Sequence, residues 1–262
     1  MGVKPNMNPT DWLKFLEEIA SQADQIALQF FRKQNLQIET KPDLSPVTEA
    51  DKAIEKAAYE LVQKNHPGLG FFGEEQGEVL KSDGARLIID PIDATRNFMR
   101  GIPLFATLLA IEEGGEVIAG LVSAPALASR WHATRGQGAV RNGQSIEVSG
   151  IQQFRYSQVF HGDLSGLEET EPPPGAYTLM SQVQRTRGFG DFYQHMLVAE
   201  GAGEVAIDPE VRPWDIAALQ IIVEEAGGRA TTLDGDRSIY GNSFVTTNGL
   251  VHDETLKILA SK

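Results

Sequence analysis

The feature that most constrains this chain is an apolar strand that runs into two carboxylates and then into a helix start. Residues 86–97 read Arg-Leu-Ile-Ile-Asp-Pro-Ile-Asp-Ala-Thr-Arg-Asn, so Asp90 and Asp93 lie where the strand stops. Ligand sites gather at strand ends in open α/β sheets, and a helix N-terminus offers N–H groups to an anion such as phosphate. Acids beside an anion site predict a divalent cation, with Mg²⁺ as first candidate. The alternative is that Asp93 only caps the helix.

Two further acidic segments favour the cation. An apolar run ends at Gly73 and is followed by Glu74 and Glu75, whose adjacent carboxylates repel each other and require a positive group nearby. Pro213 suits the first position of a helix, which places Asp215 in its first turn. An acid there is also favoured by the helix dipole alone. Only the combination of separated acids favours a metal site over caps and turns.

Composition limits the ligand and excludes several kinds of chemistry. The formal net charge is −13, which argues against nucleic-acid binding and would repel a phosphate ester unless a cation neutralised the site. The chain has no cysteine, which excludes disulfides, thiolate catalysis and cysteine-ligated zinc. Its five histidines are scattered without metal-ligand spacing, so we expect structural or surface roles for them.

The N-terminal residues and the hydropathy pattern predict a cytoplasmic protein. Residues 1–10 contain no apolar segment like that of a secretory signal, and no stretch is apolar over the roughly eighteen residues that a membrane-spanning helix needs. We therefore expect no membrane partner. The 262 residues are enough for one large domain or two smaller ones with a substantial core.

The first half of the chain reads as helices followed by an antiparallel sheet. Apolar residues recur every three or four positions over residues 10–32 and again after Thr48, which predicts two amphipathic helices. Thr48 and Asp51 fit a capping box at the start of the second helix, which ends before Pro67. The predicted strands are residues 104–111, residues 117–122 and a hairpin at Asn142-Gly143.

The second half alternates short strands and helices, which favours an α/β arrangement. Residues 151–175 combine an acidic run with Pro172-Pro173-Pro174-Gly175, a composition suited to an exposed loop. We place the boundary there, between a lobe of residues 1–150 and a lobe of residues 151–262. The elements predicted after it are a strand at 177–180, a helix from about Asp191, a strand at 205–207, a helix after Pro213, a strand near Phe244 and a final helix.

Four separated motifs, taken together, resemble the magnesium-dependent inositol monophosphatase superfamily over nearly the whole chain. In order, they are Pro46-Val47-Thr48-Glu49-Ala50-Asp51, Gly73-Glu74-Glu75, Asp90-Pro91-Ile92-Asp93-Ala94-Thr95, and Trp214-Asp215 followed by Glu225-Ala226-Gly227-Gly228. The resemblance implies an α+β fold, a layered αβαβα sandwich, with the metals at the seam of the lobes. It also implies a homodimer that acts on a small phosphate monoester.

Carried over residue by residue, the resemblance implies two or three Mg²⁺ ions per site, with Mn²⁺ as a possible substitute. Glu74, Asp90 and the backbone carbonyl of Ile92 would bind one ion. Asp90, Asp93 and Asp215, the last from the second lobe, would bind another. Such an arrangement is chemically sensible, because two cations can stabilise both the attacking and the leaving oxygen of an in-line displacement.

The same resemblance assigns the residues around the phosphate. The amides of Ala94 and Thr95 would hold it, while Glu74 and Thr95, the latter hydrogen-bonded to Asp51, would position and deprotonate the attacking water. Without the resemblance, Asp51 reads as a helix cap rather than as a catalytic residue. Lys41 matches a basic residue that the family often keeps near the metals.

Ala94 departs from the family pattern, which usually has glycine at this position. A left-handed backbone would cost alanine on the order of 1 kcal/mol. We therefore predict an ordinary φ at Ala94, and a strained value would count against this picture of the phosphate loop.

Arg96 resembles the histidinol-phosphate phosphatase branch of the superfamily, as do Arg130-Trp131 and Gly190-Asp191-Phe192-Tyr193. Histidinol phosphate carries an amine and an imidazole, so an acid near the leaving group is expected, and the resemblance gives this contact to Asp191. Asp191 could equally cap the helix that it begins. Arg187 could pair with the substrate or with Asp191. The expected substrate contacts are Asp93, Ala94, Thr95, Arg96, Arg187, Asp191 and Asp215.

Three alternatives remain open at this point. The first is an inositol-1-phosphate phosphatase or a broad sugar-phosphate phosphatase. The second is a nucleotide or sulfonucleotide phosphatase, which typically has longer insertions. The third is a relative that binds a phosphate ligand without hydrolysis, for which the loss of a metal ligand would be the usual signature. Every expected acid is present in this chain.

Overall fold

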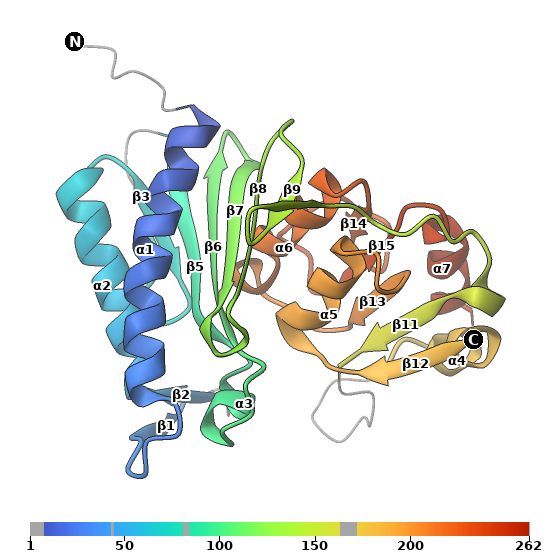
Figure 1. Ribbon diagram of the computed structural model, residues 1–262, viewed down its shortest axis with the longest axis horizontal. Helices are drawn as coiled ribbons and strands as arrows, with labels where there is room; N and C mark the ends of the chain where they lie inside the picture. Colours follow the sequence, from blue (N-terminus) through green and yellow to red (C-terminus); the bar gives the residue numbers. More distant parts are fainter. Residues whose placement is uncertain (1–7, 43–44, 81–83, 163–171, 262) are drawn as a thin grey trace.

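Five layers, in the order α, β, α, β, α, make up the fold (Figure 1). The computed structural model describes residues 8–42, 45–80, 84–162 and 172–261. The helical layers are α1 (Pro9–Phe30) with α2 (Glu49–Asn65), then α5 (Asp191–Ala199) with α6 (Pro213–Glu225), then α4 (Ala176–Gln182) with α7 (His252–Leu259). This arrangement confirms the layered sandwich that the resemblance implies.

The first sheet has eight strands in the order β10-β9-β8-β7-β6-β5-β3-β4. Its neighbours are antiparallel except for β3 and β5, which run parallel. Its strands are β3 (Gly70–Gly73), β4 (Gly77–Val79), β5 (Ala85–Asp93), β6 (Ala106–Glu113), β7 (Glu116–Ala124), β8 (Ser129–Thr134), β9 (Ala139–Arg141) and β10 (Gln144–Ile146). The parallel pair brings the ends of β3 and β5, and the acids that follow, to one edge of the sheet.

The second sheet has five strands in the order β12-β11-β13-β15-β14. Strand β11 runs parallel to β12 and β13, so the carboxyl ends of these three strands also meet at one edge. Its strands are β11 (Gln158–His161), β12 (Arg185–Gly188), β13 (Val205–Asp208), β14 (Arg229–Thr231) and β15 (Phe244–Thr247). Short elements complete the chain: β1 (Ile38–Thr40), β2 (Pro46–Thr48), α3 (Thr95–Met99) and two 3₁₀ turns at Pro125–Leu127 and Phe154–Tyr156.

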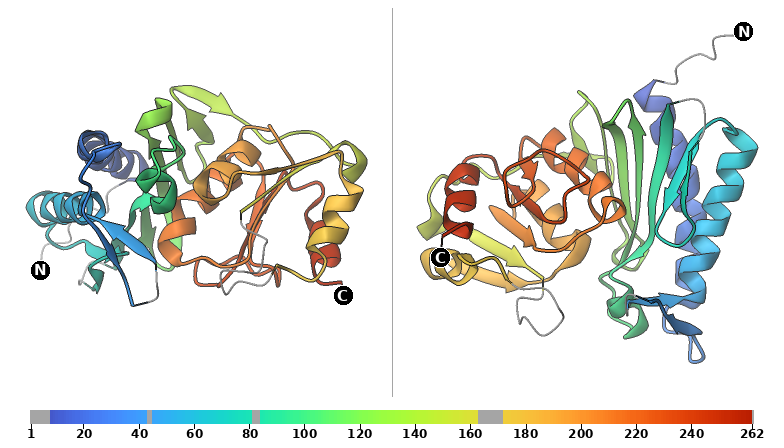
Figure 2. Two further views of the ribbon diagram at one scale, coloured as in Figure 1. Left: turned by 90° about the horizontal axis from the view of Figure 1, so that it is seen from below. Right: turned by 180° about the vertical axis from the view of Figure 1, so that it is seen from behind.

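Apolar side chains fill the spaces between the layers. One cluster lies between the first sheet and α1 with α2, which cover the same face of that sheet (Figure 2). A second cluster joins the first sheet to α5 and α6, and a third lies between the second sheet and α4 with α7. Helix α6 is apolar on nearly all sides because it lies between the two sheets. No helix within the described ranges is long and apolar enough to cross a membrane.

Two predictions for the second half are wrong. Residues 177–180 form part of helix α4 rather than a strand, because Ala176 and Leu179, three positions apart, are both buried and α4 packs on α7. The segment 151–175 is not only a loop, since it contains β11, which lies between β12 and β13 in the second sheet. Its acidic run at 168–171 lies outside the described residues.

Candidate active site

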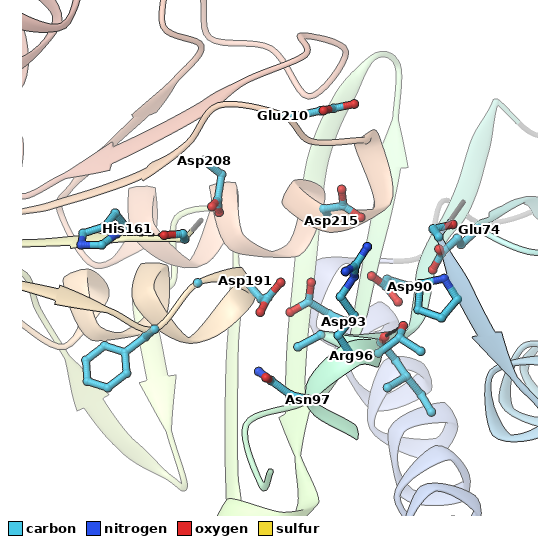
Figure 3. Close-up of a pocket in the computed structure, with 18 of the residues that line it drawn as sticks. Glu74, Asp90, Asp93, Arg96, Asn97, His161, Asp191, Asp208, Glu210 and Asp215 are labelled. Atoms are coloured by element: carbon cyan, nitrogen blue, oxygen red, sulfur yellow. Dashed lines mark hydrogen bonds between the residues drawn. The ribbon is translucent and has the colours of Figure 1, made fainter. Parts of the chain in front are cut away.

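A cavity of about 550 Å³ opens between the edges of the two sheets, where β5, β11, β12 and β13 end (Figure 3). Glu74, Asp90, Asp93 and Asp215 all line this cavity, with Glu74 and Asp90 on one side and Asp93 next to Asp191. Its other lining residues are Ser45, Pro46, Ile92, Ala94, Thr95, Arg96, Asn97, His161, Gly162, Gly188, Phe189, Gly190, Asp191, Asp208, Pro209 and Glu210. The structure thus brings together all the predicted metal ligands.

Local structure explains how each acid reaches the cavity. Asp90 and Asp93 end β5, where the register with β6 becomes irregular. Asp93 Oδ2 accepts a hydrogen bond of 2.8 Å from the N–H of Phe192, at the start of α5. Asp215 is the third residue of α6, and its Oδ2 accepts a hydrogen bond of 2.7 Å from the N–H of Arg212. Acids from β5 and from α6 therefore both reach the cavity.

The acids raise one another's pKa. Asp90 is only 3% exposed, and burial, followed by the charges of Glu74, Asp93 and Asp215, raises its pKa well above the usual value. Burial, opposed by the hydrogen bond from Arg212, raises the pKa of Asp215 to about 7. Asp90 Oδ1 is buried, and no donor within the described residues forms a hydrogen bond with it. Carboxylates that repel one another, one of them with an unpaired oxygen, favour the binding of a cation between them.

These observations fit a hard divalent cation, since the donors are all carboxylate or carbonyl oxygens. As the side chains stand, however, the described residues contain no group of three acids or histidines already arranged around one point. The carboxylates would have to turn further toward one another to hold an ion.

A lysine provides the positive group that the adjacent glutamates require. Lys41 Nζ lies 2.6 Å from Glu74 Oε1 and 2.5 Å from Glu75 Oε1. Burial lowers the pKa of Lys41, but the hydrogen bonds and charges of the two glutamates outweigh it and raise the pKa above its usual value. The sequence expectation of a basic residue beside the metal ligands is thus supported by geometry.

Asp51 and Thr95 have other hydrogen-bond partners than the predicted ones. Asp51 Oδ2 accepts from the N–H of Thr48 at 2.9 Å and from its hydroxyl at 2.5 Å, which completes the capping box of α2. Thr95 Oγ1 donates to the carbonyl of Ile92 at 2.9 Å. The predicted hydrogen bond between Thr95 and Asp51 is therefore replaced by two local ones, since each side chain has a backbone partner within three residues.

The prediction of an ordinary φ at Ala94 is wrong. Ala94 has φ 65° and ψ 46°, in the left-handed region. The chain must turn from β5 into α3 within one residue, and this turn requires the conformation that glycine adopts without cost. This left-handed value counts against the predicted picture of the phosphate loop, although Ala94 and Thr95 both line the cavity.

The predicted substrate residues divide into two groups. Arg96 and Asp191 line the cavity, so the structure places them as expected. Asp191 is the first residue of α5 and follows the cap residue Gly190, so it is not the cap. Arg187 is exposed, does not line the cavity and donates to the carbonyl of Thr186 at 2.7 Å.

Sequence reasoning missed several residues of the site. Asp208 and Glu210 line it, and the signal for Asp208 was available, because it ends an apolar strand just as Asp90 does. Glu55 was also missed: it is fully buried and accepts hydrogen bonds from the N–H groups of Glu75 at 2.8 Å and Gln76 at 2.6 Å. It therefore fixes the turn that carries Glu74, a role that no local pattern indicates.

Residues 8–261 match the inositol monophosphatase family. A histidinol-phosphatase of Mycobacterium tuberculosis is 43% identical over 91% of this chain and 94% of its own, and one of Streptomyces coelicolor is 40% identical over 95% and 97%. The crystal structure of the extragenic suppressor protein suhB from Bartonella henselae superposes with a TM-score of 0.88, at 29% identity over 95% of this chain and 98% of its own.

Proposed function

The chain belongs to the inositol monophosphatase family and is a phosphoric monoester hydrolase, and from this premise we propose that it hydrolyses histidinol phosphate to histidinol and phosphate with Mg²⁺. The observation that carries the proposal is the convergence of Glu74, Asp90, Asp93 and Asp215, from separate segments, on one cavity. The histidinol-phosphatases among the relatives, with 40% or more identity over most of both chains, support the choice of ester.

The four acids and the carbonyl of Ile92 would hold the ions. When bound, Mg²⁺ supplies the positive charge that stabilises the phosphoryl oxygens and makes the attacking water more acidic. Mn²⁺, which also accepts oxygen ligands, would be a substitute. The unpaired Oδ1 of Asp90 supports this assignment.

The remaining residues would bind the phosphate and move the proton. The amides of Ala94 and Thr95, at the start of α3, would donate to the phosphate, since amides in the first turn have no carbonyl partner within the helix. Glu74 would accept the proton of the water. Thr95 Oγ1, which donates to the carbonyl of Ile92, would orient that water by accepting a hydrogen bond from it. Asp51 would act indirectly, by fixing the start of α2 near the site.

The second lobe would receive the alcohol part of the ester. Histidinol carries an amine and an imidazole, and Asp191, Asp208 and Glu210, all from the second lobe, place carboxylates in the cavity. Arg96, from α3, lines the phosphate end. We do not assign a substrate contact to Arg187, which lies outside the cavity lining.

Three broader proposals accompany this one. The boundary between the lobes lies near residue 150, between β10 of the first sheet and β11 of the second. The protein is a homodimer, as the resemblance implies, which light scattering after size-exclusion chromatography would test. It serves histidine synthesis in the cytoplasm, which growth of a histidinol-phosphatase-deficient host without histidine would test.

Phosphate release from a panel of esters at equal Mg²⁺ concentration tests the main proposal. Histidinol phosphate should have the highest kcat/KM, and chelation of the metal should abolish turnover. A clear preference for inositol 1-phosphate would overturn the assignment to this ester while leaving the hydrolase intact. Failure to hydrolyse any ester would favour the phosphate-binding alternative.

A further inference from the structure

The side of the cavity formed by the second sheet has a distinct wall. It consists of Gly162, Phe189, Gly190 and Asp208, which we call the distal wall. These residues are close neighbours: a Cβ atom on Gly162 would lie 3.1 Å from Asp208 Oδ1 and 3.7 Å from Gly190 Cα. They follow or end β11, β12 and β13, whose carboxyl ends meet at one sheet edge. In Figure 3, Asp208 lies at the end of the cavity away from Glu74 and Asp90.

A buried histidine holds Asp208 from behind. His195 of α5 is fully buried, and its Nε2 lies 2.8 Å from Asp208 Oδ2. Its Nδ1 lies 2.7 Å from the hydroxyl of Thr246 on β15, and its ring packs on Phe244. A carboxylate oxygen can only accept, so Nε2 donates to Asp208 and Nδ1 accepts from Thr246. Both ring nitrogens are therefore satisfied, and the Asp208 carboxylate is fixed in one orientation.

This arrangement leaves the second oxygen of Asp208 for a ligand. Oδ2 is engaged by His195, whereas Oδ1 lies beside Gly162, which lines the cavity and carries no side chain to cover it. An anchored carboxylate binds a cation better than a free one, because less side-chain entropy is lost when the complex forms.

An aromatic surface lies next to the anchored carboxylate. The ring of Phe189 is 36% exposed although it is apolar, and it lines the cavity. Its position is set by an edge contact with Tyr193 and a tilted contact with Phe160, at centroid distances of 5.5 and 5.8 Å. A flat ring or an ammonium group can pack on such a face while it donates to a neighbouring carboxylate. The distal wall thus has the two features that suit a cationic or imidazole-bearing group.

We propose that His195 is a positioning residue that fixes Asp208, so that the distal wall selects phosphate esters whose alcohol part is cationic. This inference rests on the proposed phosphatase function and adds the origin of its selectivity. His195 acts only through Asp208, since it is buried behind the wall and does not line the cavity. It gives a part in function to one of the five histidines, for which the sequence predicted structural or surface roles.

The experiment compares kcat and KM of the full-length protein at saturating Mg²⁺ for two esters. One is histidinol phosphate, and the other is inositol 1-phosphate, whose alcohol part is uncharged. His195→Leu should lower kcat/KM for histidinol phosphate by roughly tenfold, mainly through KM, because the carboxylate loses its charge-assisted hydrogen bond. Turnover of inositol 1-phosphate should change much less. His195→Gln, which keeps an N–H donor, should retain more of the selectivity.

His252 offers a matched control. It is also fully buried and hydrogen-bonded to two threonines, Thr231 and Thr247, but does not line the cavity. His252→Leu should lower the melting temperature without changing the ratio of kcat/KM for the two esters. If His195→Leu does not fold, Thr246→Val, which removes the hydrogen bond to Nδ1, takes its place and should shift the ratio in the same direction.

The two proposals fail in different ways. A wild-type protein that does not prefer histidinol phosphate would overturn the proposed substrate. A wild-type protein that does prefer it, with an unchanged ratio in folded His195→Leu or Thr246→Val, would overturn only the role of His195. An equal loss of kcat/KM for both esters would likewise show that His195 has only a structural role.

Discussion

Ala94 illustrates how a single residue bears the strain of the site. Its left-handed backbone joins β5 directly to α3, and no side chain caps that short helix. The turn places Asp93 at the end of the strand and Thr95 at the start of the helix, both on the cavity. The protein therefore retains a costly conformation at the point where function requires a sharp turn.

Replacing Ala94 by glycine should stabilise the protein by about 1 kcal/mol, since glycine adopts a positive φ without the steric cost of Cβ. Urea unfolding measures this change. Ala57→Gly in the middle of α2 is the control and should destabilise the protein by a similar amount, because glycine has a lower helix propensity than alanine. Equal destabilisation by both substitutions would contradict the strain at Ala94.

Asp93→Asn should lower kcat by orders of magnitude at saturating Mg²⁺, because an amide is a poorer ligand for a hard cation than a carboxylate. The fold should persist, since the amide oxygen can still accept the hydrogen bond from Phe192. Circular dichroism checks the fold and phosphate release checks activity. Asp253→Asn changes an exposed acid of α7 and should have no such effect. Normal turnover in Asp93→Asn would remove Asp93 from the metal ligands.

At the scale of elements, α6 carries Asp215 to the site by packing very closely on the first sheet. Gly120 of β7 makes this possible: a Cβ there would lie 2.5 Å from Ile221 Cγ2 and 3.0 Å from the carbonyl of Ala218. Because α6 also packs on β14 and β15, it cannot move away freely. The position of Asp215 thus depends on the presence of glycine, which has no side chain, at position 120 on a strand far from Asp215 in sequence.

Gly120→Ala should lower the free energy of unfolding by about 1–3 kcal/mol, because the added methyl group forces α6 away from β7. It should also weaken Mg²⁺ binding, which isothermal titration calorimetry measures, because Asp215 moves with α6. Gly150→Ala is the matched control, since no atom of the part of the chain that the structure describes lies within 4 Å of the added methyl group. Unchanged stability of Gly120→Ala would show that the helix has room to adjust.

At the scale of the whole molecule, several acids are buried in a chain whose formal net charge is −13. Burial is the largest cause that raises the pKa of Asp51, Glu55 and Asp215 to about 7, from ordinary values of 3.8 to 4.5. Between about pH 4 and 7 the folded protein therefore holds protons that the unfolded chain has released. The resulting stabilisation is complete below this window and is lost as pH rises through it.

The melting temperature of the metal-free protein should accordingly fall from about pH 5 to about pH 8, which differential scanning fluorimetry with a chelator measures. Mg²⁺ should raise it more at pH 8 than at pH 5, because protons compete with the metal for the carboxylates. Asp215→Asn should reduce this effect of Mg²⁺. A melting temperature that rises with pH without metal, or an equal effect of Mg²⁺ at both pH values, would contradict the electrostatic picture.

The sequence by itself determined what depends on neighbouring residues. The acids that end β5, the capping box of Thr48 and Asp51, and Asp215 in the first turn of α6 follow from periodicity and caps, and the structure confirms these placements. The resemblance added the order of the layers. These features could be predicted because each motif folds within a few residues of itself.

Only the tertiary structure decided what depends on contacts between distant segments. The left-handed turn at Ala94, the helix at α4, the support of the Glu74 turn by Glu55 and the pairing of Asp208 with His195 all follow from packing. In each case local propensity allows more than one conformation, and the burial of side chains and hydrogen-bonding groups selects one. The sequence thus named the acids of the site, whereas the close packing of two sheets around α5 and α6 decided how they meet.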